Sequence, residues 1–312
     1  MPAYPTSWFR SFIIAARSWL LVGVSVGLLA LLGGCSALRI GYNQAPDLLY
    51  WYLDGYVDFN GAQTPRVREA LTQWLAWHRR SQLPDYAALL ARAQTEVLAD
   101  TTAARACEWQ REVIVRADVA FDRAAPAAAE FLLTVTPQQV AHVERRQAKA
   151  NDEFRDDYLQ SDPRKRAEAT LRRTVERAES LYGRLTDVQR ARMAEALPRS
   201  PFDPEAWLAE RRVRQQEALA LMRRFGGDTT AREPAEAALR AYVQRLERSP
   251  REPYRRYAER LSAFNCAFAA TLHNGTNAAQ RRTAADKLAG WEGDVRSLLA
   301  ELPRAVPADT AR

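Results

Sequence analysis

The sequence predicts an all-α protein, folded as a multi-helix bundle of about nine or ten helices. Alanine, leucine, arginine and glutamate, all strong helix formers, dominate the chain, and the one isoleucine after Ile40 is Ile114. Apolar residues recur at helical spacing, for example at Leu171, Val175 and Ala178. Because no alternating run of strand length competes with this pattern, we expect no β-sheet.

The N-terminal segment is typical of a secretory signal. Arg10 and Arg17 are the only charged residues among the first 38, and a long apolar stretch follows them. A basic stretch, an apolar stretch and small residues before a cleavage site are the three parts of such a signal. The small residues here are Gly33 and Gly34, directly before Cys35. We therefore expect the segment to be removed.

The stretch from Leu32 to Cys35 resembles the lipobox of bacterial lipoproteins. In that class the cysteine receives a diacylglycerol, the signal is cut before it, and the new amine is acylated. The resemblance implies cleavage between Gly34 and Cys35 and a membrane anchor on Cys35. Ser36 stands where an aspartate would hold a Gram-negative lipoprotein at the inner membrane, so the resemblance implies the outer membrane, facing the periplasm. The alternative is an uncleaved membrane helix, since about twenty apolar residues span a bilayer.

This interpretation divides the chain into four parts. Residues 1–34 are a lipoprotein signal peptide, 35–46 a lipidated linker, 47–302 an all-helical domain and 303–312 a flexible tail. The formal net charge is +7, but acidic and basic residues are interspersed, as on solvated helical surfaces. With a periplasmic address, this pattern argues against nucleic acid as a partner.

The helix predicted to begin near Pro46 carries the most distinctive side chains. Tyr50 and Trp51 put aromatic rings on more than one side of it, so it is either packed in the core or placed against the membrane interface. Core packing is the favoured alternative. Asp54 and Asp58 are four residues apart on its polar edge. Paired carboxylates can do acid–base chemistry or bind a cation, but we expect arginines to neutralise them. These four side chains form a candidate interaction surface rather than a catalytic site.

Two cysteines remain after the predicted lipidation, Cys107 and Cys266. A disulfide between them would suit the oxidising periplasm. Two buried thiols that never meet are the alternative, because sequence alone cannot bring the two Cα atoms within bridging distance.

Prolines and capping residues divide the remaining chain into helices. Prolines predict breaks along the chain at Pro84, Pro126, Pro137, Pro163, Pro204, Pro250 and Pro253. Three segments place a capping residue three positions before a glutamine, the arrangement of a capping box: Thr136 with Gln139, Thr186 with Gln189, and Asn277 with Gln280.

Two family resemblances bear on function. The first two capping segments, LTVTPQQ and RLTDVQ, resemble the LTxxQ motif of Spy-type periplasmic stress chaperones, although helix capping explains them as well. Residues 42–59, followed by VREALTQWLAWHRRSQLPDYAALL and later by NDEFRDDYL, YGRLTDVQ and WLAERRVRQQ, resemble an uncharacterised family of bacterial lipoproteins, a domain of unknown function. That resemblance implies a lipid anchor and an all-helical fold, and it carries no activity.

Sequence motifs for catalysis are missing. The three histidines, His78, His142 and His273, have no ligand at metal spacing, and no HExxH, CxxC, phosphate loop or nucleophile elbow occurs. We expect no enzyme, cofactor or metal. The expected function is an outer-membrane helical platform for an envelope protein partner. The alternatives are a holdase-type chaperone or envelope-stress protein, favoured by a concave face mixing arginine with apolar groups, and an unrecognised envelope enzyme, favoured by a pocket joining Asp54 or Asp58 with a histidine.

Overall fold

The computed structural model describes residues 37–301, which form helices joined by turns, with no strand among them. Two compact units make up the chain, Met1–Gln44 and Ala45–Arg312. In the first unit the described element is α3 (Ala37–Asn43), which lies within the stretch predicted as linker. Gly34, Cys35 and the predicted tail lie outside the described residues, so the signal and its cleavage stay predictions.

The second unit contains the remaining helices, and their bounds follow in chain order: α4 (Ala45–Val57), α5 (Gln63–Ser81), α6 (Leu83–Glu96), α7 (Ala103–Leu132), α8 (Pro137–Tyr158), α9 (Pro163–Tyr182), α10 (Asp187–Ala196), the 3-10 turn η1 (Leu197–Arg199), α11 (Pro204–Phe225), α12 (Arg232–Glu247), α13 (Glu252–Asn274) and α14 (Ala278–Ala300). The described residues thus hold twelve α-helices, and the predicted nine or ten is too low. Part of the difference is α3, because the sequence predicts a linker over its residues. Within the same residues, no helix is both long and apolar enough to cross a membrane.

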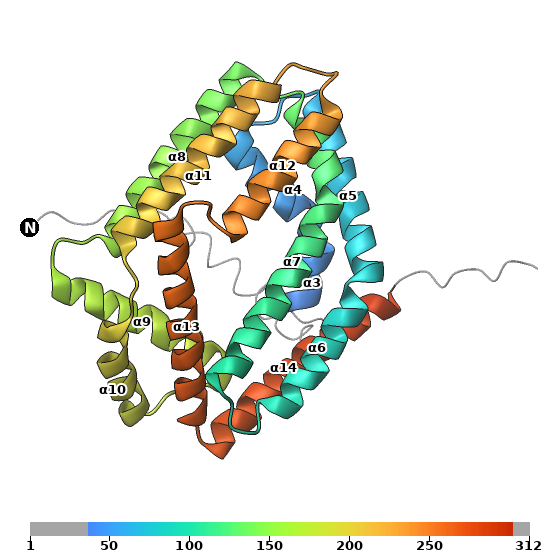
Figure 1. Cartoon of the computed structure of the whole chain (residues 1–312). Helices are drawn as coiled ribbons and strands as arrows, with labels where there is room; N and C mark the ends of the chain where they lie inside the picture. The colour runs from blue at the N-terminus through green and yellow to red at the C-terminus, as the bar shows by residue number, and fades with distance from the viewer. Residues whose placement is uncertain (1–36, 302–312) are drawn as a thin grey trace, which may run out of the picture. The chain divides into compact units, whose positions relative to one another are not determined.

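Helices of the second unit pack mainly in pairs along their lengths (Figure 1). The main pairs are α6 with α14, α8 with α11, and α4 with α5. The long helix α7 packs against both α12 and α13. It therefore connects the helices at one end of this unit with those at the other.

Two clusters of buried apolar side chains join helices of the second unit. The larger cluster joins the C-terminal ends of α7 and α11 to the beginnings of α8 and α12, and its buried members are Ala129, Leu132, Leu133, Val135, Val140, Val143, Leu219, Phe225 and Ala235. The smaller cluster joins α9 to α10 through Leu185 of the turn between them, and its buried members are Ala178, Leu185 and Met193. Burial of such side chains contributes roughly 1.5–3 kcal/mol each for the larger ones.

The turn between α11 and α12 packs against the turn between α7 and α8, and this contact requires glycine. A Cβ on Gly226 would lie 2.6 Å from the carbonyl oxygen of Val135 and 2.7 Å from that of Met222. The next residue, Gly227, has φ +85° and donates its N–H to the Leu133 carbonyl at 2.9 Å. A side chain at either position would therefore strain the contact.

Helix α7 continues through Pro126, so the predicted break at this proline is wrong. A proline inside a helix leaves the carbonyl four residues earlier, here that of Asp122, without its N–H donor. Arg240 of α12 supplies one: its Nη2 donates to the Asp122 carbonyl at 3.2 Å, and its Nη1 pairs with the Asp122 carboxylate. The tertiary contact satisfies the carbonyl that the proline frees.

All three predicted capping boxes form, at the beginnings of α8, α10 and α14. Sequence reasoning missed a fourth exchange of the same kind. The Asn60 N–H donates to Gln63 Oε1 at 3.0 Å, and the Gln63 N–H donates to Asn60 Oδ1 at 3.0 Å. Here Ala62 precedes the helix directly, so Asn60 lies two residues further out, in the turn before α5. The spacing of Asn60 and Gln63 is nevertheless the same as that of cap and glutamine in the other three, and that spacing is the signal that could have found the exchange.

The four glutamines pair, and each pair joins two helix beginnings that are distant in sequence. We call the first pair, Gln63 with Gln139, the first glutamine clasp. Gln139 Nε2 donates to Gln63 Oε1 at 2.6 Å and to the Asp58 carbonyl at 2.9 Å. Gln63 Nε2 donates to the Thr134 carbonyl at 2.9 Å. Each glutamine thus contacts the backbone just before its partner's capping residue.

The second glutamine clasp, Gln189 with Gln280, repeats this geometry. The two side-chain amides exchange N–H···O bonds of 2.7 and 2.9 Å. Gln189 Nε2 also donates to the Gly275 carbonyl at 2.9 Å, and Gln280 Nε2 to the Arg184 carbonyl at 3.0 Å. In both clasps the accepting carbonyl stands two residues before the cap, so the same local motif is used four times.

Candidate functional site

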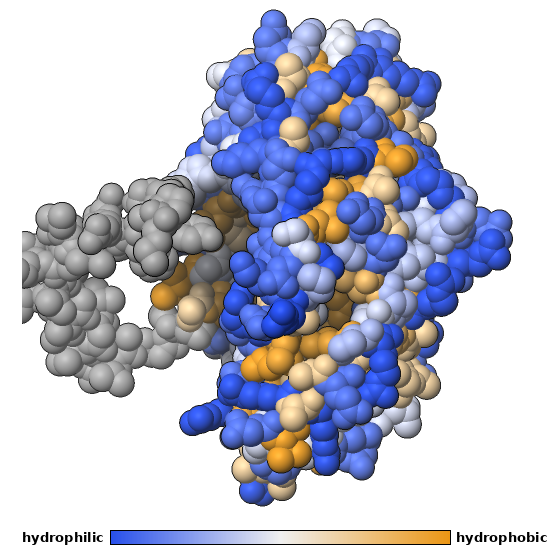
Figure 2. Space-filling view, turned by 90° about the vertical axis from the view of Figure 1, so that its left-hand side faces the viewer, coloured by the Kyte–Doolittle hydropathy of each residue, from blue (hydrophilic) through white to orange (hydrophobic). Residues whose placement is uncertain are grey.

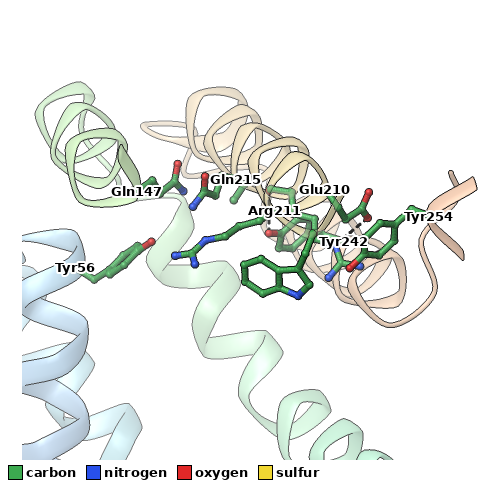
Figure 3. A pocket seen from close by; sticks show the side chains of 10 residues that line it. Tyr56, Gln147, Glu210, Arg211, Gln215, Tyr242 and Tyr254 are labelled. Atoms are coloured by element: carbon green, nitrogen blue, oxygen red, sulfur yellow. Dashed lines mark hydrogen bonds and ion pairs between the residues drawn. The ribbon is translucent and has the colours of Figure 1, made fainter. Parts of the chain in front are cut away.

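A pocket of about 350 Å³ is formed in the second unit by side chains of α4, α8, α11, α12 and α13 (Figure 3). Helix α4 contributes Tyr56, α8 contributes Gln147, and α11 contributes Trp207 and Arg211. Tyr254 of α13 lies at the far side of the pocket from Tyr56 in this view. Aromatic rings with a few polar groups are the usual lining of a small-molecule site.

A buried carboxylate, Glu210, fixes one side of this pocket. Its side chain is 3% exposed. Arg251 donates from Nε and Nη2 to the two carboxylate oxygens, each at 2.7 Å, and Arg214 Nε adds a third bond at 3.0 Å. Burial raises the pKa of Glu210, but hydrogen bonds from Arg251, Ser249 and Arg214 outweigh it, so the pKa lies below its ordinary value. Glu210 is therefore a neutralised structural anion.

The same ion-pair network extends to α12. Arg251 Nη1 also binds Glu217 at 3.1 Å, and Arg245 Nε binds Glu217 at 3.0 Å. Tyr242 donates its hydroxyl to the Arg214 carbonyl at 3.0 Å. Together these bonds lock α11, α12 and the beginning of α13 around the pocket, so its walls are held rigidly.

Four polar groups of the pocket remain open to a ligand. Arg211 forms no ion pair or hydrogen bond within the described residues, and its guanidinium lies 5.4 Å from the Trp207 ring centroid. Gln147 is only 6% exposed, yet its amide has no hydrogen-bond partner in the described part of the chain. The hydroxyls of Tyr56 and Tyr254 likewise make no hydrogen bond there. Burial raises the pKa of Tyr56, while Arg211 lowers it.

This chemistry suits the binding of a polar or anionic ligand. The pocket offers hydrogen-bond donors and one unpaired cation, and its lining contains neither a histidine nor Asp54 or Asp58. In the described residues no group of three or more His, Cys, Asp or Glu side chains could hold a metal ion.

The predicted aromatic pair on α4 is divided between core and surface. Tyr50 is 7% exposed, its hydroxyl shares a hydrogen bond of 3.0 Å with Thr64 Oγ1, and the Arg68 guanidinium lies 3.8 Å from its ring centroid. Trp51 and Tyr52 are 61% and 70% exposed. The favoured core packing therefore holds for Tyr50 and not for Trp51.

The predicted carboxylate pair closes the end of α4. Asp54 accepts the Phe59 N–H at 3.0 Å, and Asp58 adopts φ +63° where the helix ends. Among the described residues neither carboxylate pairs with an arginine, so the expected neutralisation does not occur; Arg68 pairs with Asp47 instead. The local turn uses Asp54 as a hydrogen-bond acceptor, which satisfies it without a cation.

The two cysteines considered for a disulfide lie together. Cys107 of α7 and Cys266 of α13 form a disulfide, with their Cα atoms 5.3 Å apart. Gly34 and Cys35, the predicted cleavage and lipidation site, lie outside the described residues.

The most buried of the three histidines is His273, which is 6% exposed. Its Nε2 bonds the Ala99 carbonyl at 2.7 Å, so this nitrogen carries the proton. Its Nδ1 then accepts from the Tyr182 hydroxyl at 2.8 Å. The ring is a structural connector between α9, α13 and the turn after α6.

Sequence reasoning missed Tyr56, Gln147 and Arg211 as site residues. A weak signal was present, because Trp207 and Arg211 are four residues apart and share one face of α11. That spacing alone cannot show that α4 and α8 bring Tyr56 and Gln147 opposite it.

Comparison with known proteins relates the chain to one protein family. The chain matches no curated protein and no solved structure. Residues 55–255, well over half of the chain, match the model of a family of unknown function, DUF6279. The matched segment begins before Tyr56 and ends after Tyr254, so it includes the whole pocket. The chain therefore belongs to the DUF6279 family of unknown function, in agreement with the predicted membership of an uncharacterised domain family.

Proposed function

We propose that this protein is a lipoprotein anchored to the outer membrane through Cys35, and that its helical body is an interaction platform for an envelope protein on the periplasmic side. The observation that carries the proposal is the lipobox-like stretch Leu32–Cys35, which directly follows a long uncharged apolar segment. Ser36 after the cysteine supports the outer membrane. Several acyl chains, at about 0.8 kcal/mol per buried methylene, would hold the protein firmly.

The disulfide between Cys107 and Cys266 supports this address. Disulfides form and persist in oxidising compartments such as the bacterial periplasm, and are rare in the cytosol. A secreted chain would form this bond after export.

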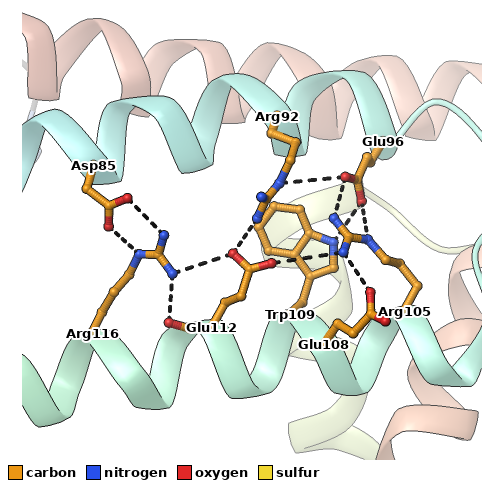
Figure 4. A network of polar contacts seen from close by, with 8 residues as sticks. All are labelled: Asp85, Arg92, Glu96, Arg105, Glu108, Trp109, Glu112 and Arg116. Atoms are coloured by element: carbon orange, nitrogen blue, oxygen red, sulfur yellow. Dashed lines mark hydrogen bonds and ion pairs between the residues drawn. The ribbon is translucent and has the colours of Figure 1, made fainter.

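A rigid surface suits a platform, and α6 and α7 are joined by a ladder of ion pairs (Figure 4). Arg116 binds Asp85 through two nitrogens, at 2.6 and 3.0 Å. Arg105 binds Glu96 in the same two-pronged manner, at 2.8 and 2.5 Å, and hydrogen bonds from Arg105 hold the pKa of Glu96 below its ordinary value. Exposed pairs contribute little stability singly, but a network fixes geometry.

Metabolic labelling of the intact protein and of Cys35→Ser tests the anchor. The unaltered protein should incorporate palmitate, lose its signal and sediment with outer membranes, whereas Cys35→Ser should do none of these. Ser36→Asp should move the labelled protein to the inner membrane. Equal fractionation of the unaltered protein and Cys35→Ser, without label in either, would contradict the proposal.

Cross-linking in cells followed by affinity purification tests the platform. One stable envelope protein recovered in proportion to the bait is the expected result. Many unrelated unfolded proteins recovered together would instead favour the chaperone alternative.

A holdase function is a second candidate because the surface mixes apolar and charged side chains. Figure 2 shows apolar patches separated by hydrophilic residues on the side of the second unit that faces left in Figure 1. On α7, Val113, Ile114, Val115 and Val119 are 42–58% exposed. If these residues bind clients, the protein should slow aggregation of a heat-unfolded test protein, and Val113→Ser with Val115→Ser should abolish the effect. No delay of aggregation would remove this candidate.

A further inference from the structure

We infer that the pocket around Arg211 binds a small organic anion with one carboxylate on a flat, ring-shaped body. This inference concerns a ligand site within the helical unit and does not depend on the lipid anchor. It rests on the charge of the lining, on the open hydrogen-bonding groups and on the aromatic walls.

The charges of the lining favour an anion. Glu210 is saturated by Arg251 and Arg214, so its negative charge is already compensated. Glu217 behind it is compensated by Arg245 and Arg251. These ion pairs leave Arg211 as the arginine of the lining without an acidic partner among the described residues. A half-buried, unpaired guanidinium is favourable for a carboxylate, which it can bind through two parallel N–H groups.

The number of open cations indicates a singly charged ligand. A phosphate monoester carries close to two negative charges at pH 7. Arg211, the open arginine of the lining, balances only one of them, and the exposed Arg146, which lowers the pKa of Tyr56, lies outside the lining. A carboxylate is matched in charge by Arg211, the one open cation among the described residues that line the pocket.

Gln147 provides the second, independent observation. Its amide makes no hydrogen bond within the described residues, and its polar atoms are not fully buried, so they are open to the pocket. Gln147 is 6% exposed, lines the pocket and lies on the same side of it as Gln215 in Figure 3. Gln215 is already occupied by a reciprocal exchange with Asn151, at 2.8 and 3.1 Å. The open amide of Gln147 is thus available to hydrogen-bond a ligand in the pocket.

The aromatic side chains determine the shape of the ligand body. Trp207, Tyr242 and Tyr254 line the pocket together with Tyr56, and aromatic faces pack best against flat or ring-shaped groups. A cavity of about 350 Å³ is at the small end of the range for ligand sites. The occupant is therefore a compact ring carboxylate rather than a long chain.

Binding of three matched probes to the purified full chain tests the inference. Benzoate has the ring and the carboxylate, benzamide replaces the charge by a neutral group of similar shape, and phenyl phosphate replaces it by a dianion. Ligand-observed NMR titration should show benzoate binding at least about tenfold more tightly than benzamide, and more tightly than phenyl phosphate. Tighter binding of phenyl phosphate would overturn the choice of carboxylate, and equal binding of benzoate and benzamide would overturn the anion site.

Variants separate this pocket from adventitious binding. Arg211→Gln should weaken benzoate binding about tenfold or more, and Tyr56→Phe and Gln147→Leu about threefold each. Arg212→Gln, the exposed neighbour on α11, is the matched control and should bind benzoate unchanged. Because Arg211 makes no ion pair in the described residues, its variant should keep the circular dichroism spectrum and melting temperature. Benzoate that does not bind, or that binds Arg211→Gln, Tyr56→Phe and Arg212→Gln equally, would overturn the proposal.

Discussion

Gln139 illustrates how much one buried side chain can fix in this protein. Its amide oxygen accepts the Thr136 N–H at 3.0 Å and thereby completes the capping box of α8. Its amide nitrogen donates to Gln63 and to the carbonyl of Asp58, the residue directly after α4. Three backbone segments therefore depend on one residue that is 4% exposed.

Replacing Gln139 by leucine should lower the free energy of unfolding by about 3 kcal/mol, because it leaves several buried donors and acceptors without partners. Gln138→Leu, at the exposed neighbouring position, is the matched control and should change it by less than about 0.5 kcal/mol. Urea unfolding followed by circular dichroism measures both. Equal effects of the two substitutions would show that the clasp does not stabilise the fold.

His78 gives the protein a pH-dependent contribution to stability. The ring is 9% exposed, stacks on Trp74 at a centroid distance of 5.1 Å and lies 3.3 Å from the Tyr86 hydroxyl. Burial lowers its pKa below the ordinary value of 6.5. The unfolded chain therefore binds this proton more readily than the folded chain.

The stabilising effect of neutral His78 should be complete above about pH 6.5 and should decline as the pH falls toward the lowered pKa. The difference in unfolding free energy between the unaltered protein and His78→Gln is accordingly expected to shrink between pH 7.5 and 5.5. The same comparison with His142→Gln, at a half-buried position on α8, gives the background. A difference that grows on acidification would contradict the burial argument.

The glutamine clasps also mark the limit of prediction at the residue scale. The spacing of Thr136 and Gln139 predicts the capping box, because both groups belong to one turn of helix. Nothing in that spacing shows that Gln139 meets Gln63, since their contact is created by the packing of α4 against α8 and of α5 against α7. The same limit applied to Gln147 and Arg211, whose roles depend on helices that are distant in sequence.

At the scale of elements, tertiary bonds hold both halves of α7. The sequence left the first of these bonds undecided, and at the position of the second it predicted a helix break. Its first half carries the disulfide from Cys107 to Cys266 of α13. Its second half passes through Pro126, where Arg240 of α12 satisfies the Asp122 carbonyl. Propensity predicted a helix here, but only tertiary contacts decide that the helix runs uninterrupted past the proline.

Removal of the disulfide should destabilise the protein by about 4 kcal/mol, because it closes a loop with a sequence separation of 159 residues and long loops gain most from closure. The measurement is urea unfolding of the unaltered protein and of Cys107→Ala with Cys266→Ala, each with and without reductant. Reductant should lower the midpoint of the unaltered protein and leave that of the double variant unchanged. Alkylation of both thiols in the non-reduced native protein would show that the bond does not form.

The two clasps occupy different parts of the second unit and share no residue. The first lies beside the larger apolar cluster through Thr134 and Val140, its neighbours in sequence and space. The second lies beside the smaller cluster, next to Leu185. The unit is thus fastened at two separate places by the same arrangement of side chains.

Double substitutions should reveal this organisation. Gln139→Leu and Gln280→Leu break different clasps, so their unfolding free energies should add to within about 0.5 kcal/mol. Gln63→Leu and Gln139→Leu break the same clasp, and the second substitution removes a group that the first has already left unpaired, so the double variant should lose less than the sum. Coincident transitions by circular dichroism and tryptophan fluorescence would justify the two-state treatment. Strong coupling between Gln139→Leu and Gln280→Leu would mean that the two clasps are not independent. Additive effects of Gln63→Leu and Gln139→Leu would mean that the paired glutamines do not act through their mutual hydrogen bonds.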